Sequence, residues 1–154
     1  MKCATVLAVV VGAIWAAGTF VLFRSQVENL NLSITTQQVP YTGDLRLLIV
    51  HVRPKNLGKV LGRPDTYRLR VKEIPVSGQA WKALQRSELK EILSLNMLRH
   101  YPEGYEIEPG VEYDDIEIIV VKKGATLLVS AELGFEYPDN DDDNIDVHEV
   151  VRIE

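Results

Sequence analysis

The sequence predicts an all-β protein: an antiparallel, two-layer, immunoglobulin-like sandwich of six or seven strands, with one helical insertion and a preceding N-terminal transmembrane helix. Three observations support this prediction. After residue 24 the chain mostly alternates apolar and polar residues, Pro, Gly and Asn interrupt it at intervals typical of sandwich turns, and the first two dozen residues are almost free of charge.

The N-terminal segment predicts a membrane anchor. Residues 4–23 contain no charged side chain, and a helix of that length, at about 1.5 Å per residue, spans roughly the 30 Å hydrocarbon core of a bilayer. We therefore expect residues 1–24 to form an uncleaved anchor and residues 25–154 one extracytoplasmic domain, with a cytoplasmic N-terminus because Lys2 precedes the span. The alternative is a signal peptide cleaved after the small residues 16–18, which leaves a secreted or periplasmic domain.

Strands are predicted wherever apolar residues recur with period two or form a short continuous run. These segments are residues 30–34, 45–52, 67–71, 116–121, 127–135 and 145–153. Residues 45–52 are nearly all apolar, as expected of a strand that is covered on both faces, and residues 116–121 form a second such run. The first run is expected to end at residues 53–58, whose Pro, Asn and Gly favour a turn.

Residues 79–93 interrupt the alternation and predict a helix. Trp81, Leu84, Leu89 and Ile92 fall near one face of that helix, and polar residues fall on the others. We expect the helix to pack across one end or one open edge of the sandwich, which is a common protection for an edge strand. A short strand over residues 95–98 remains the alternative for the segment that follows.

Two turn segments carry a resemblance to a known class of domain. Val52-Arg53-Pro54-Lys55-Asn56-Leu57-Gly58-Lys59 follows a strand, and Pro109-Gly110-Val111-Glu112-Tyr113 precedes a later one. This arrangement resembles bacterial immunoglobulin-like and adhesion-related modules of exported proteins, of the CARDB-like or fibronectin III-like kind. The resemblance covers residues 28–154 and implies a sandwich that binds or spaces other molecules. It implies no catalytic residues.

An acidic loop is the candidate metal site. Asp139, Asp141 and Asp143 match the first three ligand positions of a calcium-binding loop. Asn144 stands where the turn glycine belongs, and Val150 stands where the bidentate glutamate belongs. We therefore interpret the segment as a solvated hairpin loop and keep a weak calcium site as the alternative; no other cofactor is expected.

The charges are distributed unevenly along the domain. Residues 46–72 are strongly basic and residues 103–118 strongly acidic, so the favoured interpretation is that the two segments pair across the sheet. Arg68, Arg70 and Lys72 on one strand face are the candidate binding residues, for anionic headgroups or an acidic partner near the membrane.

Aromatic residues gather around the predicted insertion and the strand ends. They are Trp81, Tyr101, Tyr105, Tyr113 and Tyr137. The favoured interpretation is packing, with Trp81 sealing the predicted helix onto the sandwich. The alternative is a binding surface for a peptide or glycan, in which Trp81 is the candidate contact.

Several activities are excluded by what the sequence lacks. The formal net charge of −5 argues against nucleic acid as the main partner, and the single cysteine, Cys3, lies in the predicted anchor. No Gly-x-Ser-x-Gly motif and no glycine-rich phosphate loop occurs, so we expect no enzyme activity. The sequence predicts a membrane-anchored extracytoplasmic binding or scaffold module, an accessory subunit of an envelope complex with a protein partner. A calcium-stabilised adhesion-type module and an envelope enzyme are the two alternatives.

Overall fold

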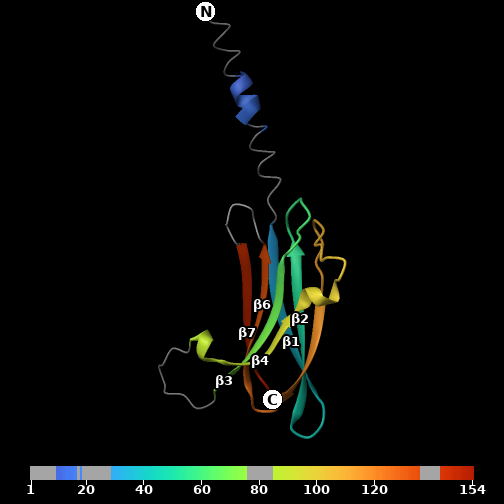
Figure 1. The fold of residues 1–154 in the computed structure, drawn as a ribbon, viewed down its shortest axis with the longest axis vertical. Helices are drawn as coiled ribbons and strands as arrows, with labels where there is room; N and C mark the ends of the chain where they lie inside the picture. Colours follow the sequence, from blue (N-terminus) through green and yellow to red (C-terminus); the bar gives the residue numbers. More distant parts are fainter. Residues whose placement is uncertain (1–9, 17, 19–28, 76–84, 136–142) are drawn as a thin grey trace, which may run out of the picture.

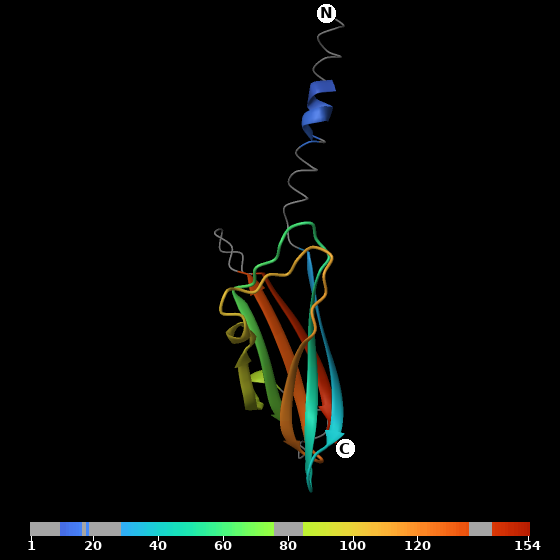
Figure 2. The same cartoon turned by 90° about the vertical axis from the view of Figure 1, so that its right-hand side faces the viewer.

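The computed structural model describes residues 10–16, 18, 29–75, 85–135 and 143–154. In this part of the chain, seven strands form two antiparallel sheets (Figure 1), whose strand orders are β1-β2-β5 and β4-β3-β6-β7. Viewed from the side, the two sheets form separate layers that pack face to face (Figure 2). The prediction of an all-β, two-layer, antiparallel architecture is confirmed.

The strands have the following bounds. The three-stranded sheet consists of β1 (Leu30–Pro40), β2 (Leu45–Asn56) and β5 (Asp115–Lys122). The four-stranded sheet consists of β4 (Lys90–Asn96), β3 (Thr66–Ile74), β6 (Thr126–Phe135) and β7 (Asp143–Arg152). Two short 3₁₀ helices, η1 (Arg86–Glu88) and η2 (Met97–His100), flank β4. Each of the six predicted strand segments overlaps one of these strands.

The core lies between the sheets and is built from alternate residues of the strands. The fully buried side chains include Leu48, Val50 and Val52 of β2, Tyr67, Leu69 and Val71 of β3, and Leu127, Val129, Ala131 and Leu133 of β6. Successive strand residues point to opposite faces, so the period-two pattern of the sequence becomes one buried face per strand. Burying each large aliphatic side chain stabilises the fold by about 1.5–3 kcal/mol.

The two sheets are linked along the β1–β7 side by side chains. The hydroxyl of Thr36 donates a hydrogen bond to Glu149 over 3.0 Å, and Nε2 of Gln38 donates to the carbonyl of Arg152 over 2.8 Å. Oε1 of Gln38 also accepts a hydrogen bond from the backbone N–H of Glu154. These contacts join β1 to the C-terminal end of the chain and close this side of the sandwich.

On the other side, η2 connects β4 to the beginning of β5. Met97 is buried in the core, and Nε2 of His100 lies 2.8 Å from the carboxylate of Glu117 on β5. Arg99 lies 3.9 Å from the same carboxylate. The first part of β5 is therefore held by η2.

The helix predicted over residues 79–93 is wrong for the residues that the structure describes. The chain forms only η1 over residues 86–88, and strand β4 begins at Lys90. Residues 79–84, which include Trp81, lie outside the described ranges.

A β-bulge disturbs the apolar spacing at the C-terminal end of this segment. Strand β4 pairs with β3, and the register shifts between Val71 and Lys72, so that Ile92 is left over between two paired residues. Such a bulge interrupts the period-two alternation. Leu93 and Leu95 lie two apart and are half-buried against the core, whereas Ile92 is 45% exposed. The apolar residues of this segment therefore no longer recur with the period of two that is typical of a strand.

The turn predicted at residues 53–58 begins later than expected, because β2 continues through Pro54 to Asn56. Strand pairing with β5 ends at Val52, opposite Asp115. The carbonyl of Pro54 faces that side and accepts the N–H of Tyr113 over 3.0 Å. In an antiparallel strand, the N and C=O of one residue point to the same side. The N–H that Pro54 lacks would therefore point toward the β5 side, where β5 has already ended. The proline thus costs no hydrogen bond of the ladder.

Asn56 fixes the turn that follows β2. Its side chain is completely buried, and its Nδ2 donates to the carbonyls of Val60 and Ile107, each over 2.8 Å. Its Oδ1 accepts the N–H of Gly58 over 2.9 Å. All the polar atoms of this buried amide are therefore used, and they tie the β2–β3 connection to the segment that precedes β5.

The segment predicted to be an anchor is described in part. Residues 10–16 are helical, and the side chains of Val10, Val11, Ile14 and Trp15 are exposed. Residues 1–9, 17 and 19–28 lie outside the described ranges. Within the described residues, no helix combines the length and the apolar character that crossing a membrane requires.

Candidate functional site

The outer face of the three-stranded sheet carries an apolar surface. On β5, Ile116, Ile118 and Val120 are 53%, 60% and 53% exposed. The cross-strand register places Ile49 beside Ile118 and Leu47 beside Val120. We call this surface the apolar outer face; its members are Val39, Leu47, Ile49, Ile116, Ile118 and Val120.

This exposure corrects the expectation that residues 45–52 are covered on both faces. The second face of β2 is only half-buried by the residues that the structure describes, and the matching residues of β5 are exposed. Single exposed apolar side chains are ordinary on protein surfaces, but a contiguous apolar row is typical of an interaction site.

Strand β5 is also an edge strand. Within the described part of the chain it pairs with β2 on one side and with no strand on the other. An edge of this kind presents unpaired backbone N–H and C=O groups, which can accept an added strand. Proteins usually protect such edges with charged residues, proline or a bulge, but residues 118–121 of β5 contain only Ile and Val. The apolar outer face and the open edge thus adjoin each other.

Ion pairs surround the beginning of β5 and join the basic and acidic segments of the sequence. Nε of Arg53 lies 3.2 Å from Asp114, Lys55 lies 2.9 Å from Glu112, and Arg63 lies 2.7 Å from Glu106. Each of these pairs joins residues 46–72 to residues 103–118. The favoured prediction of pairing between the two segments is confirmed for them.

Asp114 also contacts His51, at 3.0 Å from Nδ1. Desolvation acts to raise the pKa of the Asp114 carboxyl, but the hydrogen bonds and positive charge of His51 and Arg53 outweigh it and lower that pKa. Asp114 lies beside the apolar outer face. One end of this surface therefore carries a charge that is already paired with His51 and Arg53.

A cluster of tyrosines holds Asp115, which points the opposite way into the sandwich. Its carboxylate accepts the hydroxyls of Tyr67 and Tyr105, each over 2.8 Å, and that of Tyr101. The rings of Tyr67 and Tyr105 stack with centroids 5.2 Å apart, and Tyr113 packs against Tyr105 at 5.9 Å. The predicted packing role is thus supported for three of the predicted aromatic residues, while Trp81 and Tyr137 lie outside the described ranges.

Burial, followed by the contact with Asp115, raises the pKa of Tyr67, Tyr101 and Tyr105 well above the ordinary value. These phenols are therefore protonated donors at neutral pH. Their arrangement fixes the first residue of β5 and the segment before it, which positions the open edge. The sequence carries one signal for Asp115, which occupies an inward position in the alternation that begins β5.

The outer face of the four-stranded sheet carries a small polar pocket of about 50 Å³. The cross-strand register places Arg70, Ser130 and His148 in one row across β3, β6 and β7. Arg86 of η1 lies at the same pocket, and its carbonyl accepts Nζ of Lys72 over 3.0 Å. The complete lining is Arg70, Lys72, Arg86, Leu128, Ser130, Glu132, Asp146 and His148.

Two of the predicted binding residues, Arg70 and Lys72, therefore share one site, and Arg68 lies outside it. Arg68 is on the same strand and face but is exposed and does not line the pocket. Trp81 lies outside the described ranges. Sequence reasoning missed Arg86, Ser130, Glu132 and Asp146, because nothing in the sequence shows which strands are neighbours.

The predicted calcium ligands lie mostly outside the described ranges. Asp139 and Asp141 are not described, and Asp143 is described as the first residue of β7, where its backbone pairs with Phe135. Among the described residues, no group of three or more His, Cys, Asp or Glu side chains is arranged to hold a metal ion.

Comparisons with known proteins give a fold. No protein-family model matches the chain, and no curated protein matches it. The crystal structure of a Bordetella pertussis protein described as ApaA is similar, with a TM-score of 0.56 over 82% of this chain and 94% of that one, at 10% sequence identity. An X-ray structure of a Northeast Structural Genomics Consortium target is similar with a TM-score of 0.54, over 82% of this chain and 89% of that one, at 12% identity.

At these identities the similarity shows the fold alone. The predicted resemblance to exported sandwich modules is supported for the all-β fold. The narrower assignment to CARDB-like or fibronectin III-like modules stays a prediction.

Proposed function

We propose that the protein is a membrane-anchored, extracytoplasmic binding module that holds an extended segment of a protein partner along β5. It acts in this way as an accessory or scaffold subunit of an envelope complex. The observation that supports the proposal most is the apolar outer face beside the open edge of β5. The uncharged residues 4–23 support the anchor, and the proposed site of action follows from them.

An added strand satisfies both features of this surface. Its backbone pairs with the free N–H and C=O groups of β5, and its alternate side chains cover the apolar row. Ile116, Ile118 and Val120 are each about half exposed, so covering them stabilises a complex by roughly 1 kcal/mol apiece. The backbone hydrogen bonds add affinity, and the apolar row favours a partner segment with apolar residues at alternate positions.

The charges of the edge indicate how the partner segment is composed. Lys122 and Lys123 are exposed where β5 ends, and Glu112 and Asp114 near its beginning are already paired with basic residues. A partner segment with an acidic residue near the two lysines therefore complements the edge.

A second copy of this chain fits the edge poorly. Consider two copies that pair edge to edge through β5 and are related by a two-fold axis. If both apolar outer faces lie on one side of the joined sheet, the two β5 strands are antiparallel. The two Leu30 residues, where the tethers to the anchors join the sandwiches, then lie at opposite ends of the pair. Two copies whose sandwiches stand with the same end toward one membrane would not meet in this way, so we infer a different protein as the occupant.

We also infer an immunoglobulin-like sandwich. Lettered A to G, the strands have the orders A-B-E and D-C-F-G. The constant-type immunoglobulin order is A-B-E-D and C-F-G, so the two differ in the sheet to which the fourth strand belongs. In this arrangement strand E, which is β5 here, is left as an edge.

Site-specific photocrosslinking in the native membrane tests the proposal. A photoreactive amino acid replaces Ile116, Ile118 or Val120 in the full-length chain, and the matched control replaces exposed Arg68 on the opposite outer face. We expect one protein to crosslink from all three β5 positions, at partner residues that are spaced by two, and not from position 68.

Three outcomes would refute the proposal. They are the absence of an adduct from β5, equal adducts from β5 and from position 68, and an adduct with a second copy of this chain. Partner sites that are scattered over a folded surface, instead of alternating along one segment, would refute strand addition.

A further inference from the structure

A site of different chemistry lies on the opposite face of the sandwich. The pocket on the outer face of the four-stranded sheet collects three cationic side chains, Arg70, Lys72 and Arg86, together with the hydroxyl of Ser130. Arg70, Ser130 and His148 stand side by side on three neighbouring strands, and η1 brings Arg86 to them. These residues come from four separate elements, so their convergence is a property of the fold.

We propose that this pocket binds a small tetrahedral oxyanion, namely phosphate or the phosphate group of a soluble molecule. Guanidinium, ammonium and hydroxyl donors that converge on one point are the groups that recognise phosphate. The pocket offers about 50 Å³, and a single water needs roughly 10–15 Å³. There is thus room for a group with about four oxygen atoms.

Most of the donors in the pocket remain available. Nη2 of Arg70 donates to Glu132 over 2.6 Å, which uses one of the five N–H groups of the guanidinium. Nζ of Lys72 donates to the carbonyl of Arg86, which uses one of its three N–H groups. Within the described residues, neither the guanidinium of Arg86 nor the hydroxyl of Ser130 has a hydrogen-bond partner.

The carboxylates of the pocket limit the affinity without cancelling the positive charge. Glu132 and Asp146 are paired across β6 and β7 in the row next to Arg70. Three permanent cations therefore face two carboxylates, before His148 is counted. Because Glu132 already orients Arg70, an anion meets a guanidinium whose position is fixed.

His148 is the second observation that indicates a missing ligand. Its Nδ1 is buried and has no hydrogen-bond partner among the described residues. Burial, and then the positive charge of Arg86, lower the pKa of His148, whereas Asp146 acts to raise it. The other charged groups facing the pocket are Arg70, Lys72 and Glu132. The imidazole is therefore neutral near pH 7 when the pocket is empty.

An anion beside His148 reverses this balance. It favours the protonated ring, which then donates Nδ1–H to an anion oxygen, so binding raises the pKa of His148. By linkage, the same coupling makes the anion bind more tightly as the pH falls through the pKa of the complex. The pocket is thus a phosphate site whose affinity rises on acidification.

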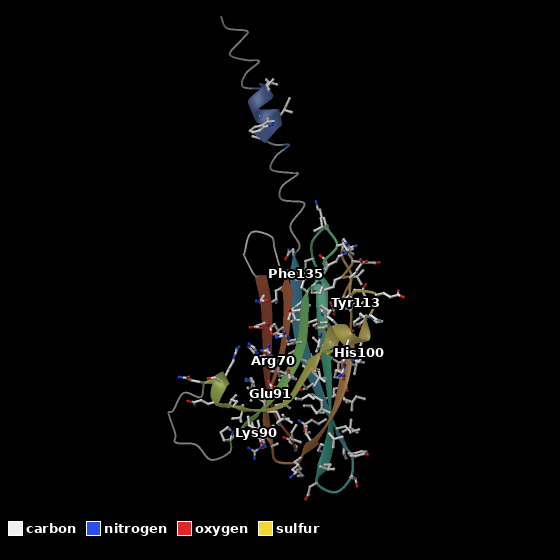
Figure 3. All side chains as sticks on the ribbon, viewed as in Figure 1. Arg70, Lys90, Glu91, His100, Tyr113 and Phe135 are labelled. Carbon is white, nitrogen blue, oxygen red and sulfur yellow. The ribbon has the colours of Figure 1, made fainter. Side chains whose placement is uncertain are left out.

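The position of the pocket favours a soluble ligand over a lipid headgroup. Arg70 lies near the middle of the sandwich, whereas Phe135 marks the end at which β1 begins and the N-terminal segment joins (Figure 3). The pocket is therefore away from the end of the sandwich at which β1 begins.

The test is a phosphate titration of the full-length chain in detergent micelles, followed by isothermal titration calorimetry in every variant and also through the ring resonance of His148 where that residue is present. Total ionic strength is held constant with chloride, and methyl phosphate is titrated in parallel. The variant Arg86→Glu removes a pocket cation, and the matched control Arg152→Glu makes the same charge change at an exposed residue of β7, on the same sheet face and outside the pocket. A third variant, His148→Gln, keeps a polar neutral side chain.

We expect saturable binding of phosphate, with a ratio of wild-type to His148→Gln affinity that rises from about pH 7.5 to about pH 6. Arg86→Glu should weaken binding about tenfold or more, and Arg152→Glu by no more than about twofold. His148→Gln should remove the pH dependence beyond that of phosphate itself. Equal binding of methyl phosphate indicates a phosphate group that is carried by a larger molecule.

Three results would overturn the inference. They are binding signals that do not saturate, equal losses in Arg86→Glu and Arg152→Glu, and a wild-type pH dependence equal to that of His148→Gln. If the chain binds anionic vesicles and soluble phosphate does not compete with them, the assignment of a soluble ligand to the pocket would be wrong. Circular dichroism of each variant verifies that it is folded, and the resonance of His148 reports the pocket directly in the variants that keep this residue.

Discussion

Replacing Asp115 with alanine removes the acceptor that three tyrosine hydroxyls share. Tyr67 is completely buried and Tyr105 is 5% exposed, so neither hydroxyl can turn to water when the carboxylate is lost. A buried hydroxyl without a partner costs about 1–3 kcal/mol, which gives roughly 2–6 kcal/mol for these two. We expect the midpoint of urea unfolding to fall by about 1 M or more, since small proteins lose about 1–3 kcal/mol of stability per molar urea.

The matched control is the neighbouring residue. Asp114 points to the other face of the sheet, where its contacts to His51 and Arg53 are exposed to solvent. Asp114→Ala should therefore leave the unfolding midpoint nearly unchanged. Far-UV circular dichroism of the full-length chain in detergent monitors both variants. Equal midpoints for Asp115→Ala and the wild type, or equal losses in the two variants, would refute the role given to the tyrosine cluster.

Three further predictions concern other parts of the sandwich. Asn56→Ala should cost roughly 2–4 kcal/mol of unfolding free energy, because it leaves two carbonyls and one N–H of buried turns unpaired; urea unfolding measures it. Burial and then Asp115 raise the pKa of Tyr67 and Tyr105 above the usual 10.0, so their contribution to stability is complete below pH 10 and declines above it. The loss should be about 1.4 kcal/mol per pH unit for each residue, and the absorbance at alkaline pH should show both phenols ionising only with unfolding. Ile118→Lys should change stability by less than about 0.5 kcal/mol, since the side chain is exposed, yet abolish the crosslinks from Ile116.

The sequence predicted the strands well because burial in a sandwich follows a simple rule. Tyr67, Leu69 and Val71 alternate with basic residues in the sequence, and the structure buries the first set in the core. The ion pairs between the basic and acidic segments were also predicted, since opposite charges on neighbouring strands stabilise each other.

The last part of the wrongly predicted helix has a local cause. One bulged residue, Ile92, changes the spacing of the apolar residues in β4, and a period measured on the sequence cannot distinguish a bulge from a helical turn. The late end of β2 has a different cause. Pro54 is compatible with strand β2 because the neighbouring strand, β5, has ended at that point. The sequence of β2 alone does not show where β5 ends.

The candidate sites depend on which strands are neighbours, and this explains what was missed. Arg70 and Lys72 were singled out from one strand, but Ser130 and His148 join them only through the order β3-β6-β7. The run of residues 116–121 was seen as apolar, but its exposure follows from the edge position of β5. Alternation identifies a face, whereas only topology shows whether that face is covered.

Amide hydrogen exchange of β5 measures most directly whether this edge holds a partner strand. The full-length chain is labelled in native membranes and again after purification in detergent, and peptides covering residues 116–121 are compared with those covering the buried core of β6. We predict strong protection of residues 116–121 in the membrane and its loss on purification, with β6 unchanged. Equal exchange of residues 116–121 in the two states would contradict the proposal that a partner strand pairs with β5.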